Sequence, residues 1–266
     1  MPAPSIFVST GTLVPGNSFV RNVPRVFTWP LYLPHRAGIG PSPDRFIADT
    51  AYQPLKELRN CWVEPLVRLG LASREASVEA ARIKLRELIA SRPGAKVIVV
   101  GQSQGGLIVA ELALDPEFAE HIAAAVFVGA PFLGSDALEW QLLKWSTCFP
   151  GVAAMQCGHP SQHDLAERMV AGWPSHIRPV ICVSPDDELV SERSAQAAKF
   201  PTGIIPEVYW LHHQPPTQAD VHHLETAAGG RGMVHLRMCR HRSWVGLIEK
   251  MVDEHTLEEE ALPLAA

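Results

Sequence analysis

Residues 96–114 read KVIVVGQSQGGLIVAELAL, and this stretch decides the fold. It opens with an unbroken apolar, β-branched run at 97–100, which is typical of a strand buried on both faces. The chain then turns at 101–106, and the pattern of apolar residues that follows favours a helix. A strand, a glycine-rich turn and a helix in direct succession predict an α/β fold with a mostly parallel central sheet and helices on both faces.

The turn has the form Gly-x-Ser-x-Gly, with Ser103 at its centre. Between a strand and a helix this pattern is a nucleophile elbow, in which the serine adopts a strained backbone conformation and its Oγ projects above the sheet edge. Gly101 and Gly105 are expected because side chains there would collide with the neighbouring strand and helix. The N–H of Gln104, at the start of the helix, is predicted to hold the oxygen of a reacting carbonyl group.

Length and composition favour one domain over residues 1–266, because 47% hydrophobic residues can fill one sizeable core. The net charge of −5 and the lack of a basic stripe argue against nucleic acid as a partner. No run reaches the roughly 18 apolar residues of a transmembrane helix. The N-terminus lacks the features of a signal peptide, which predicts a cytoplasmic protein unless the native start has been trimmed.

The five cysteines form no Cys-x-x-Cys pair, so neither a disulfide framework nor a zinc site is expected. Cys148 and Cys157 are close enough in sequence to bridge a loop, although reduced thiols are favoured. The histidine-rich stretch 212–223 lacks a His-x-x-x-His helix or paired carboxylates, so surface histidines explain it better than a metal site. We therefore expect no metal and no cofactor.

Further elements alternate along the chain. Apolar runs predict strands at 5–9, 25–29, 124–128, 179–184 and 207–211, with an extension strand at 234–238. Helical spacing of apolar residues predicts helices at 55–69, 73–92, 163–170, 191–199 and 244–252. Ser73 is the expected N-cap of the second of these helices. Residues 255–266 are expected to form a frayed tail.

Residues 136–160 contain an apolar and aromatic stretch where no strand of the sheet is expected. Two interpretations remain open. The stretch is either a core helix with a loop, or a small cap that covers the serine and lines an apolar pocket. We favour the cap, which predicts a substrate with an apolar acyl group.

A serine nucleophile needs a histidine to accept its proton and an acid to orient that histidine. In this kind of fold the chain order is serine, acid, histidine. Asp187 is the preferred acid because it follows the strand at 179–184 in the pattern Asp-x-x-Val. Asp186 and Asp136 are the alternatives.

The preferred base is His241, which lies just before the last predicted helix. His222, His223 and His235 remain alternatives for this role. Thr12, in the glycine loop after the first strand, is the candidate for the second oxyanion N–H. The carboxyl ends of parallel strands meet at one edge of a sheet, so Ser103, Asp187 and the Thr12 loop are expected to lie together there.

These motifs resemble those of the serine α/β-hydrolase superfamily, and more narrowly those of small bacterial lipases and esterases of the triacylglycerol lipase kind. The resemblance rests on Gly-Gln-Ser-Gln-Gly-Gly at 101–106, Val-Gly-Ala-Pro-Phe-Leu-Gly-Ser at 128–135, Asp-Glu-Leu-Val at 187–190, and His241. One departure is Thr10-Gly11, where the family usually has His-Gly.

The resemblance implies a carboxylic-ester hydrolase that uses a Ser103–His241–Asp187 triad and an acyl-enzyme, with Gln104 and Thr12 as the oxyanion hole. The expected partner is a small-molecule ester or a lipid, and the oligomeric state is left open. The same machinery serves acyltransferases and thioesterases, so these are alternatives. A hydrolase fold that has become a non-catalytic binding module is the alternative from another class.

Overall fold

In the computed structural model of the chain, the described residues include seven parallel strands that form one sheet, in the order β2-β1-β3-β4-β5-β6-β7. The structure describes residues 5–9, 47–49, 73–139, 150–212, 223–225 and 234–238, together with residues 247, 250, 251, 253 and 254. The strands are β1 (Ser5–Ser9), β2 (Ile47–Asp49), β3 (Val97–Gln102), β4 (Ile122–Val128), β5 (Arg178–Val183), β6 (Glu207–His212) and β7 (His223–Glu225).

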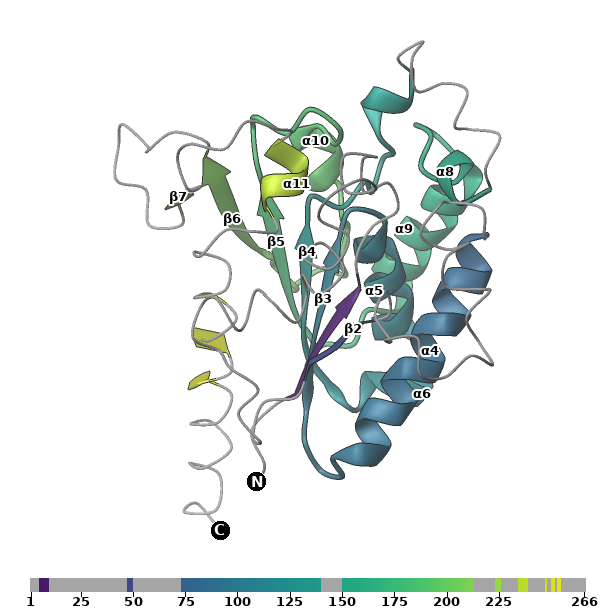
Figure 1. Cartoon of the computed structure of the whole chain (residues 1–266), viewed down its shortest axis with the longest axis vertical. Coiled ribbons are helices and arrows are strands. Elements are labelled where there is room, and N and C mark those ends of the chain that lie inside the picture. Colours follow the sequence, from purple (N-terminus) through teal and green to yellow (C-terminus); the bar gives the residue numbers. More distant parts are fainter. Residues whose placement is uncertain are drawn as a thin grey trace, which may run out of the picture.

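Six of the described helices lie between these strands in the chain, and the helix at 234–238 follows β7. They are α4 (Arg74–Ser91), α5 (Gln104–Leu114), α6 (Pro116–Ala119), α8 (Pro150–Ala153), α9 (Pro160–Gly172), α10 (Glu192–Ala195) and α11 (Val234–Met238), with a 3-10 turn η2 at Asp136–Glu139. Figure 1 shows α4, α5, α6 and α9 on one side of the sheet. It also shows α8, α10 and α11 toward the end at which the strands terminate.

The sequence pattern of the central strand β3 matches its position in the structure. Its residues are buried on both faces of the sheet. Val97 and Val99 pack into the cluster on the α5 side, whereas Ile98 and Val100 pack into the cluster on the opposite side. Successive side chains of a strand point to opposite faces, so a strand covered on both sides must be apolar throughout. The predicted two-sided burial of residues 97–100 is confirmed.

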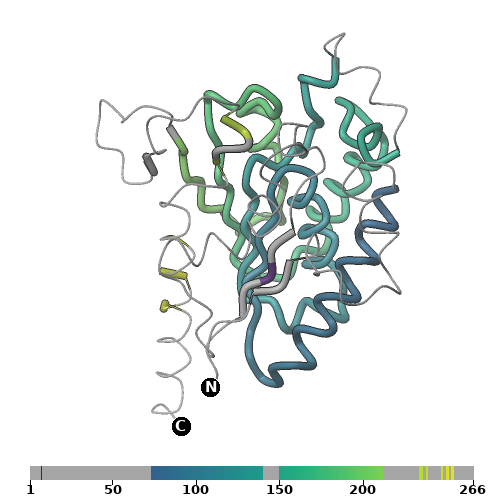
Figure 2. Tube along the Cα trace, viewed as in Figure 1, coloured from purple at the N-terminus to yellow at the C-terminus, as the bar shows by residue number. Residues whose placement is uncertain are grey.

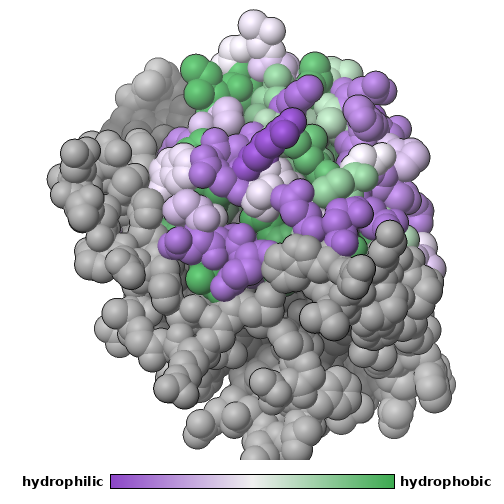
Figure 3. Space-filling model, turned by 90° about the horizontal axis from the view of Figure 1, so that it is seen from above, coloured by the Kyte–Doolittle hydropathy of each residue, from purple (hydrophilic) through white to green (hydrophobic). Residues whose placement is uncertain are grey.

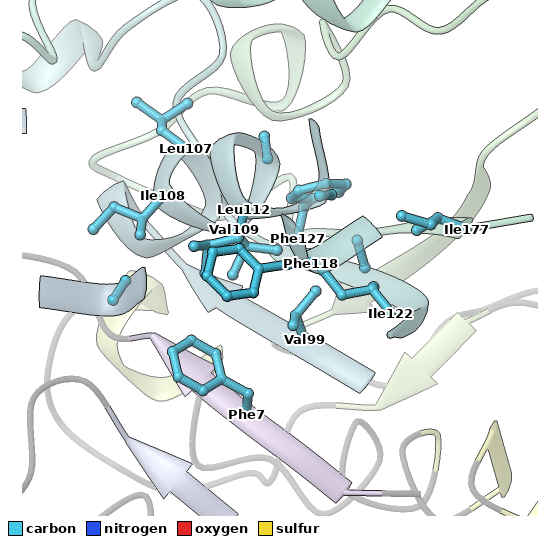
Figure 4. Packing of buried hydrophobic residues seen from close by; sticks show 14 of the residues in the cluster. Phe7, Val99, Leu107, Ile108, Val109, Leu112, Phe118, Ile122, Phe127 and Ile177 are labelled. Carbon is cyan, nitrogen blue, oxygen red and sulfur yellow. The ribbon is translucent and has the colours of Figure 1, made fainter. Parts of the chain in front are cut away.

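The larger cluster lies between the sheet and the helices α4, α5 and α9. Phe7 of β1, Val99 of β3 and Phe127 of β4 face residues of α5 such as Leu112 (Figure 4). The cluster on the other side includes Val234 and Met238 of α11 together with Leu247 and Met251. The sheet is thus covered on both faces.

Most predicted elements agree with the structure to within a few residues. Ser73 is the N-cap of α4, and its side chain accepts a hydrogen bond from the N–H of Ala76 at 3.3 Å. The strands β2 and β7 were not anticipated. The predicted strand 25–29, helix 55–69 and tail 255–266 lie outside the described residues.

One prediction of secondary structure is wrong, because residues 234–238 form the helix α11 rather than an extension strand. Val234 and Met238 are four residues apart and are both buried, which is the spacing of one helix face. Within so short a segment this spacing also fits an apolar strand, which explains the error.

An ionic network joins α4, α5 and α9 at the edge of the larger cluster. The Glu111 carboxylate lies 2.5 Å from Nη2 of Arg74 and 2.7 Å from Nη1 of Arg168. Arg74 is only 5% exposed, and burial lowers the pKa of its guanidinium while Glu111 opposes that effect. The network therefore keeps a buried cation paired, which is needed because an unpaired buried charge is costly.

We expect Glu111→Gln to lower the free energy of unfolding by about 3 kcal/mol, because the buried Arg74 loses its anionic partner. Urea denaturation followed by circular dichroism measures this change. Glu79→Gln is the matched control, since Glu79 is 57% exposed and lies 3.5 Å from Arg82. Its unfolding midpoint should stay near that of the unmodified protein. Equal midpoints for the two variants would show that the network does not stabilise the fold.

Candidate functional site

Ser103 occupies the sharp turn between β3 and α5, and its backbone is strained. Its φ of 52° and ψ of −130° make it the one non-glycine residue with positive φ among the residues that the structure describes. Such a conformation costs of order 1–3 kcal/mol and persists only when the surroundings impose it. Here the Ser103 N–H donates to the Val128 carbonyl and its C=O accepts from Gly106 N–H, both at 2.9 Å. Ser103 is therefore held in a strained turn between β3 and α5.

Two glycines make the turn possible. A Cβ on Gly101 would lie 2.3 Å from the backbone oxygen of Gly105, and one on Gly106 would lie 2.4 Å from Cβ of Ala130. Both distances are far inside van der Waals contact, so α5 can pack this closely only without side chains at these positions.

Asp187 lies in the loop after β5, and each of its carboxylate oxygens accepts a hydrogen bond. Oδ1 accepts from the N–H groups of Leu189 and Val190 at 2.9 and 3.0 Å. Oδ2 lies 2.7 Å from Nδ1 of His235, and only 1% of the Asp187 side chain is exposed. Asp187 is thus paired with a histidine inside the protein.

The other two acids lie in different surroundings. Asp186 is exposed, and its N–H donates to Oγ of Ser184. Asp136 begins η2, and its Oδ1 lies 3.5 Å from Sγ of Cys157.

Among the described residues, His235 is the histidine that pairs with Asp187. It is the second residue of α11 and is 3% exposed. His241 and His222 lie outside the described residues, and His223 is the first residue of β7. The sequence favours His241 because it lies just before the last predicted helix, whereas His235 lies in a segment that is predicted as an extension strand. Its helical spacing between Val234 and Met238 was the available signal.

Gly129, just after β4, links the serine to this pair. A Cβ on Gly129 would lie 3.1 Å from Oδ2 of Asp187 and 3.3 Å from Cε1 of His235. The preceding residue, Val128, accepts the Ser103 N–H. The end of β4 therefore contacts both the serine turn and the Asp–His pair, so these parts lie at the same edge of the sheet.

The predicted oxyanion groups are described only in part. Gln104 is the first residue of α5, is buried, and donates from its side-chain Nε2 to the carbonyl of Gly151 at 3.0 Å. Thr12 lies outside the described residues. Its loop follows β1, whose last residue, Ser9, pairs with Gly101 in the sheet.

Part of the expected cap segment, residues 136–160, lies against the elbow. Gly151 accepts the hydrogen bond from Gln104, and the Met155 carbonyl accepts the N–H of Ser135 at 2.7 Å. Val152 and Met155 pack with Leu138 in a small buried cluster. Residues 140–149 lie outside the described residues, so the cap remains a prediction.

The two described cysteines are free thiols, so Cys157 does not bridge to Cys148. Burial raises the pKa of Cys182 to about 12, and burial together with Asp136 raises the pKa of Cys157. Both thiols therefore stay protonated at neutral pH, which makes them poor nucleophiles. Among the described residues, no three His, Cys, Asp or Glu side chains are grouped as metal ligands.

Membrane-spanning helices were sought only in the described part of the chain. No helix there combines the length and the apolar character that crossing a bilayer requires.

Comparison with known proteins identifies the fold. No family model matches the sequence. No curated protein matches it either. Among solved structures, lipase B from Aspergillus fumigatus is 16% identical, with a TM-score of 0.53 over 80% of this chain and 45% of that chain.

Two further structures are similar at lower scores. Phospholipase PlaB from Legionella pneumophila is 15% identical, with a TM-score of 0.47 over 73% of this chain and 43% of that chain. A structure of the metagenome-derived lipolytic enzymes LipS and LipT is 14% identical, with a TM-score of 0.44 over 80% of this chain and 84% of that chain. The chain spans less than half the length of lipase B and of PlaB. The fold is the α/β-hydrolase fold, as the sequence motifs implied.

We expect Gly101→Ala to lower the free energy of unfolding by about 3 kcal/mol or more, because the new methyl group meets the backbone of Gly105. Gly172→Ala is the control, since no atom lies within 4 Å of the added Cβ at the end of α9. This control should be as stable as the unmodified protein or slightly more stable. Thermal denaturation of both variants tests the packing, and an unchanged midpoint for Gly101→Ala would contradict it.

Proposed function

We propose that the protein is a carboxylic-ester hydrolase whose nucleophile is Ser103, whose base is His235 and whose acid is Asp187. The observation that carries the proposal is the buried hydrogen bond of 2.7 Å between Asp187 Oδ2 and His235 Nδ1, at the edge of the sheet where the strained serine lies. The order of these residues along the chain, serine then acid then histidine, is that of α/β-hydrolases.

The hydrogen bond to Asp187 defines the chemistry of the imidazole. When Nδ1 carries the proton and donates to the carboxylate, Nε2 has the lone pair and is able to accept the proton of Ser103. Asp187 then stabilises the imidazolium that forms. Its Oδ1 is fixed by two backbone N–H groups, so the carboxylate cannot rotate without losing hydrogen bonds.

Catalysis then takes two steps. In the first, Ser103 Oγ attacks the ester carbonyl carbon, His235 receives the serine proton, and that proton passes to the departing alcohol, which leaves an acyl-enzyme. In the second, water loses a proton to His235 and attacks the acyl group, and the proton returns to Ser103 as the acid is released. The N–H groups of Gln104 and Thr12 are proposed to stabilise the oxyanion in both steps.

The proposed substrate has an apolar acyl group. Leu138, Val152 and Met155 form a buried apolar cluster in the segment whose Gly151 binds Gln104, and Leu133, which follows β4, is 42% exposed. The described residues at the end where the strands terminate form a surface that mixes hydrophobic and hydrophilic side chains (Figure 3). These features support an ester with an apolar acyl chain.

Ser103→Ala should abolish hydrolysis of p-nitrophenyl esters and labelling by a fluorophosphonate, because the attacking oxygen is removed. The readouts are the release of p-nitrophenolate and the mass of the labelled protein. The methyl group fits where the hydroxymethyl group lay, so the variant should keep its circular dichroism spectrum. Turnover by Ser103→Ala at the rate of the unmodified protein would remove Ser103 from the mechanism.

His235→Gln and His241→Gln distinguish the two candidate bases. Loss of the base should lower kcat by at least about 10³-fold, as for other members of a catalytic triad. We expect this loss for His235→Gln alone. His163→Gln is the control because His163 is exposed on α9. A loss confined to His241→Gln would assign the base to His241 and overturn our proposal.

A further inference from the structure

His235 is held by its backbone as well as by its ring. Both carboxylate oxygens of Glu188 accept the N–H of Val234, at 3.0 and 2.8 Å, and Oε2 lies 3.4 Å from the N–H of His235. These groups are the first N–H donors of α11, which have no partners within the helix. Glu188 therefore supplies the acceptor that the start of α11 needs, from a loop 46 residues earlier in the chain.

A second contact holds the backbone of His235 at its carbonyl group. Gln102 Nε2 donates to the His235 carbonyl at 3.3 Å. Gln102 directly precedes Ser103 and Glu188 directly follows Asp187. Gln102, next to Ser103, and Glu188, next to Asp187, thus both bind the backbone of His235. Figure 2 shows α11 lying close to the loop that follows β5.

A helix as short as α11 needs such contacts. It has five residues, and isolated helices of that length are not stable in water. Burial of Val234 and Met238 anchors one face of α11 to the sheet, but apolar contact is not directional. Hydrogen bonds to Glu188 and Gln102 are directional, so they define the position of His235 Cα from which the ring reaches Asp187.

We propose that Glu188 is a positioning residue, which places the base His235 through the first turn of α11, with Gln102 as the second support. This inference rests on the proposed function. Glu188 is exposed and contacts the backbone of the base rather than its ring. Its loss lets α11 shift, and a displacement of about 1 Å at a catalytic group is able to lower a rate by up to about 100-fold.

The test compares three substitutions of Glu188 by steady-state kinetics on p-nitrophenyl butyrate. Glu188→Ala should lower kcat roughly 10- to 100-fold and leave KM within about twofold, because the base is displaced while the substrate pocket is not. Glu188→Gln should keep most of the activity, since its amide oxygen has the same reach. Glu188→Asp should be impaired, since it keeps the charge but is one methylene shorter.

Three controls complete the design. Glu192→Ala, which removes an exposed acid from the first turn of α10, should leave kcat unchanged. The rate constant for fluorophosphonate labelling should fall by the same factor as kcat/KM in each Glu188 variant. Thermal midpoints identify a variant that fails to fold. The comparison of Glu188→Gln with Glu188→Asp then decides whether the length of the side chain or its charge positions His235.

Two kinds of result would overturn the inference. If Glu188→Ala has the kcat of the unmodified protein while Ser103→Ala and His235→Gln are inactive, the positioning role of Glu188 is refuted and the proposed function still holds. High activity of Glu188→Asp with low activity of Glu188→Gln would show that charge, not position, matters. An inactive unmodified protein, or an active His235→Gln variant, would instead refute the proposed function and the inference with it.

Discussion

The hydrogen bond between Asp187 and His235 is the interaction on which the arrangement of the site depends. Both side chains are almost fully buried, at 1% and 3% exposure, so each requires a partner inside the protein. Asp187 satisfies its second oxygen with two backbone N–H groups of its own loop. The carboxylate is thus fixed by its own loop, and it satisfies Nδ1 of the His235 ring.

The sheet brings this pair to the serine. The parallel strands β3, β4 and β5 end at the same edge, so the turn at Ser103, the residue Gly129 and the loop of Asp187 meet there. Gly129 leaves room for the pair, since a side chain at that position would touch both Asp187 and His235. The strain at Ser103 is sustained by the hydrogen bonds to Val128 and Gly106 and by the large buried core beneath α5.

Most of the sheet could be predicted, because its central strands carry their own pattern. Residues 97–100 are apolar without interruption, and the structure buries them on both faces. β2 and β7 were missed because each has only three residues, too few for a periodic pattern. α11 was assigned the wrong type, because Val234 and Met238 fit either a short strand or one face of a helix.

The sequence alone determined the serine turn and the loop of the acid, because both depend on neighbouring residues. Gly101 and Gly106 leave no room for a side chain at the turn that holds Ser103, and Asp187 caps its own loop through Leu189 and Val190. Only the tertiary structure decided which histidine joins Asp187. His235 reaches it because Glu188 and Gln102, 47 and 133 residues away, hold α11 in place. No local pattern records contacts over such distances, since they exist only once the chain has folded.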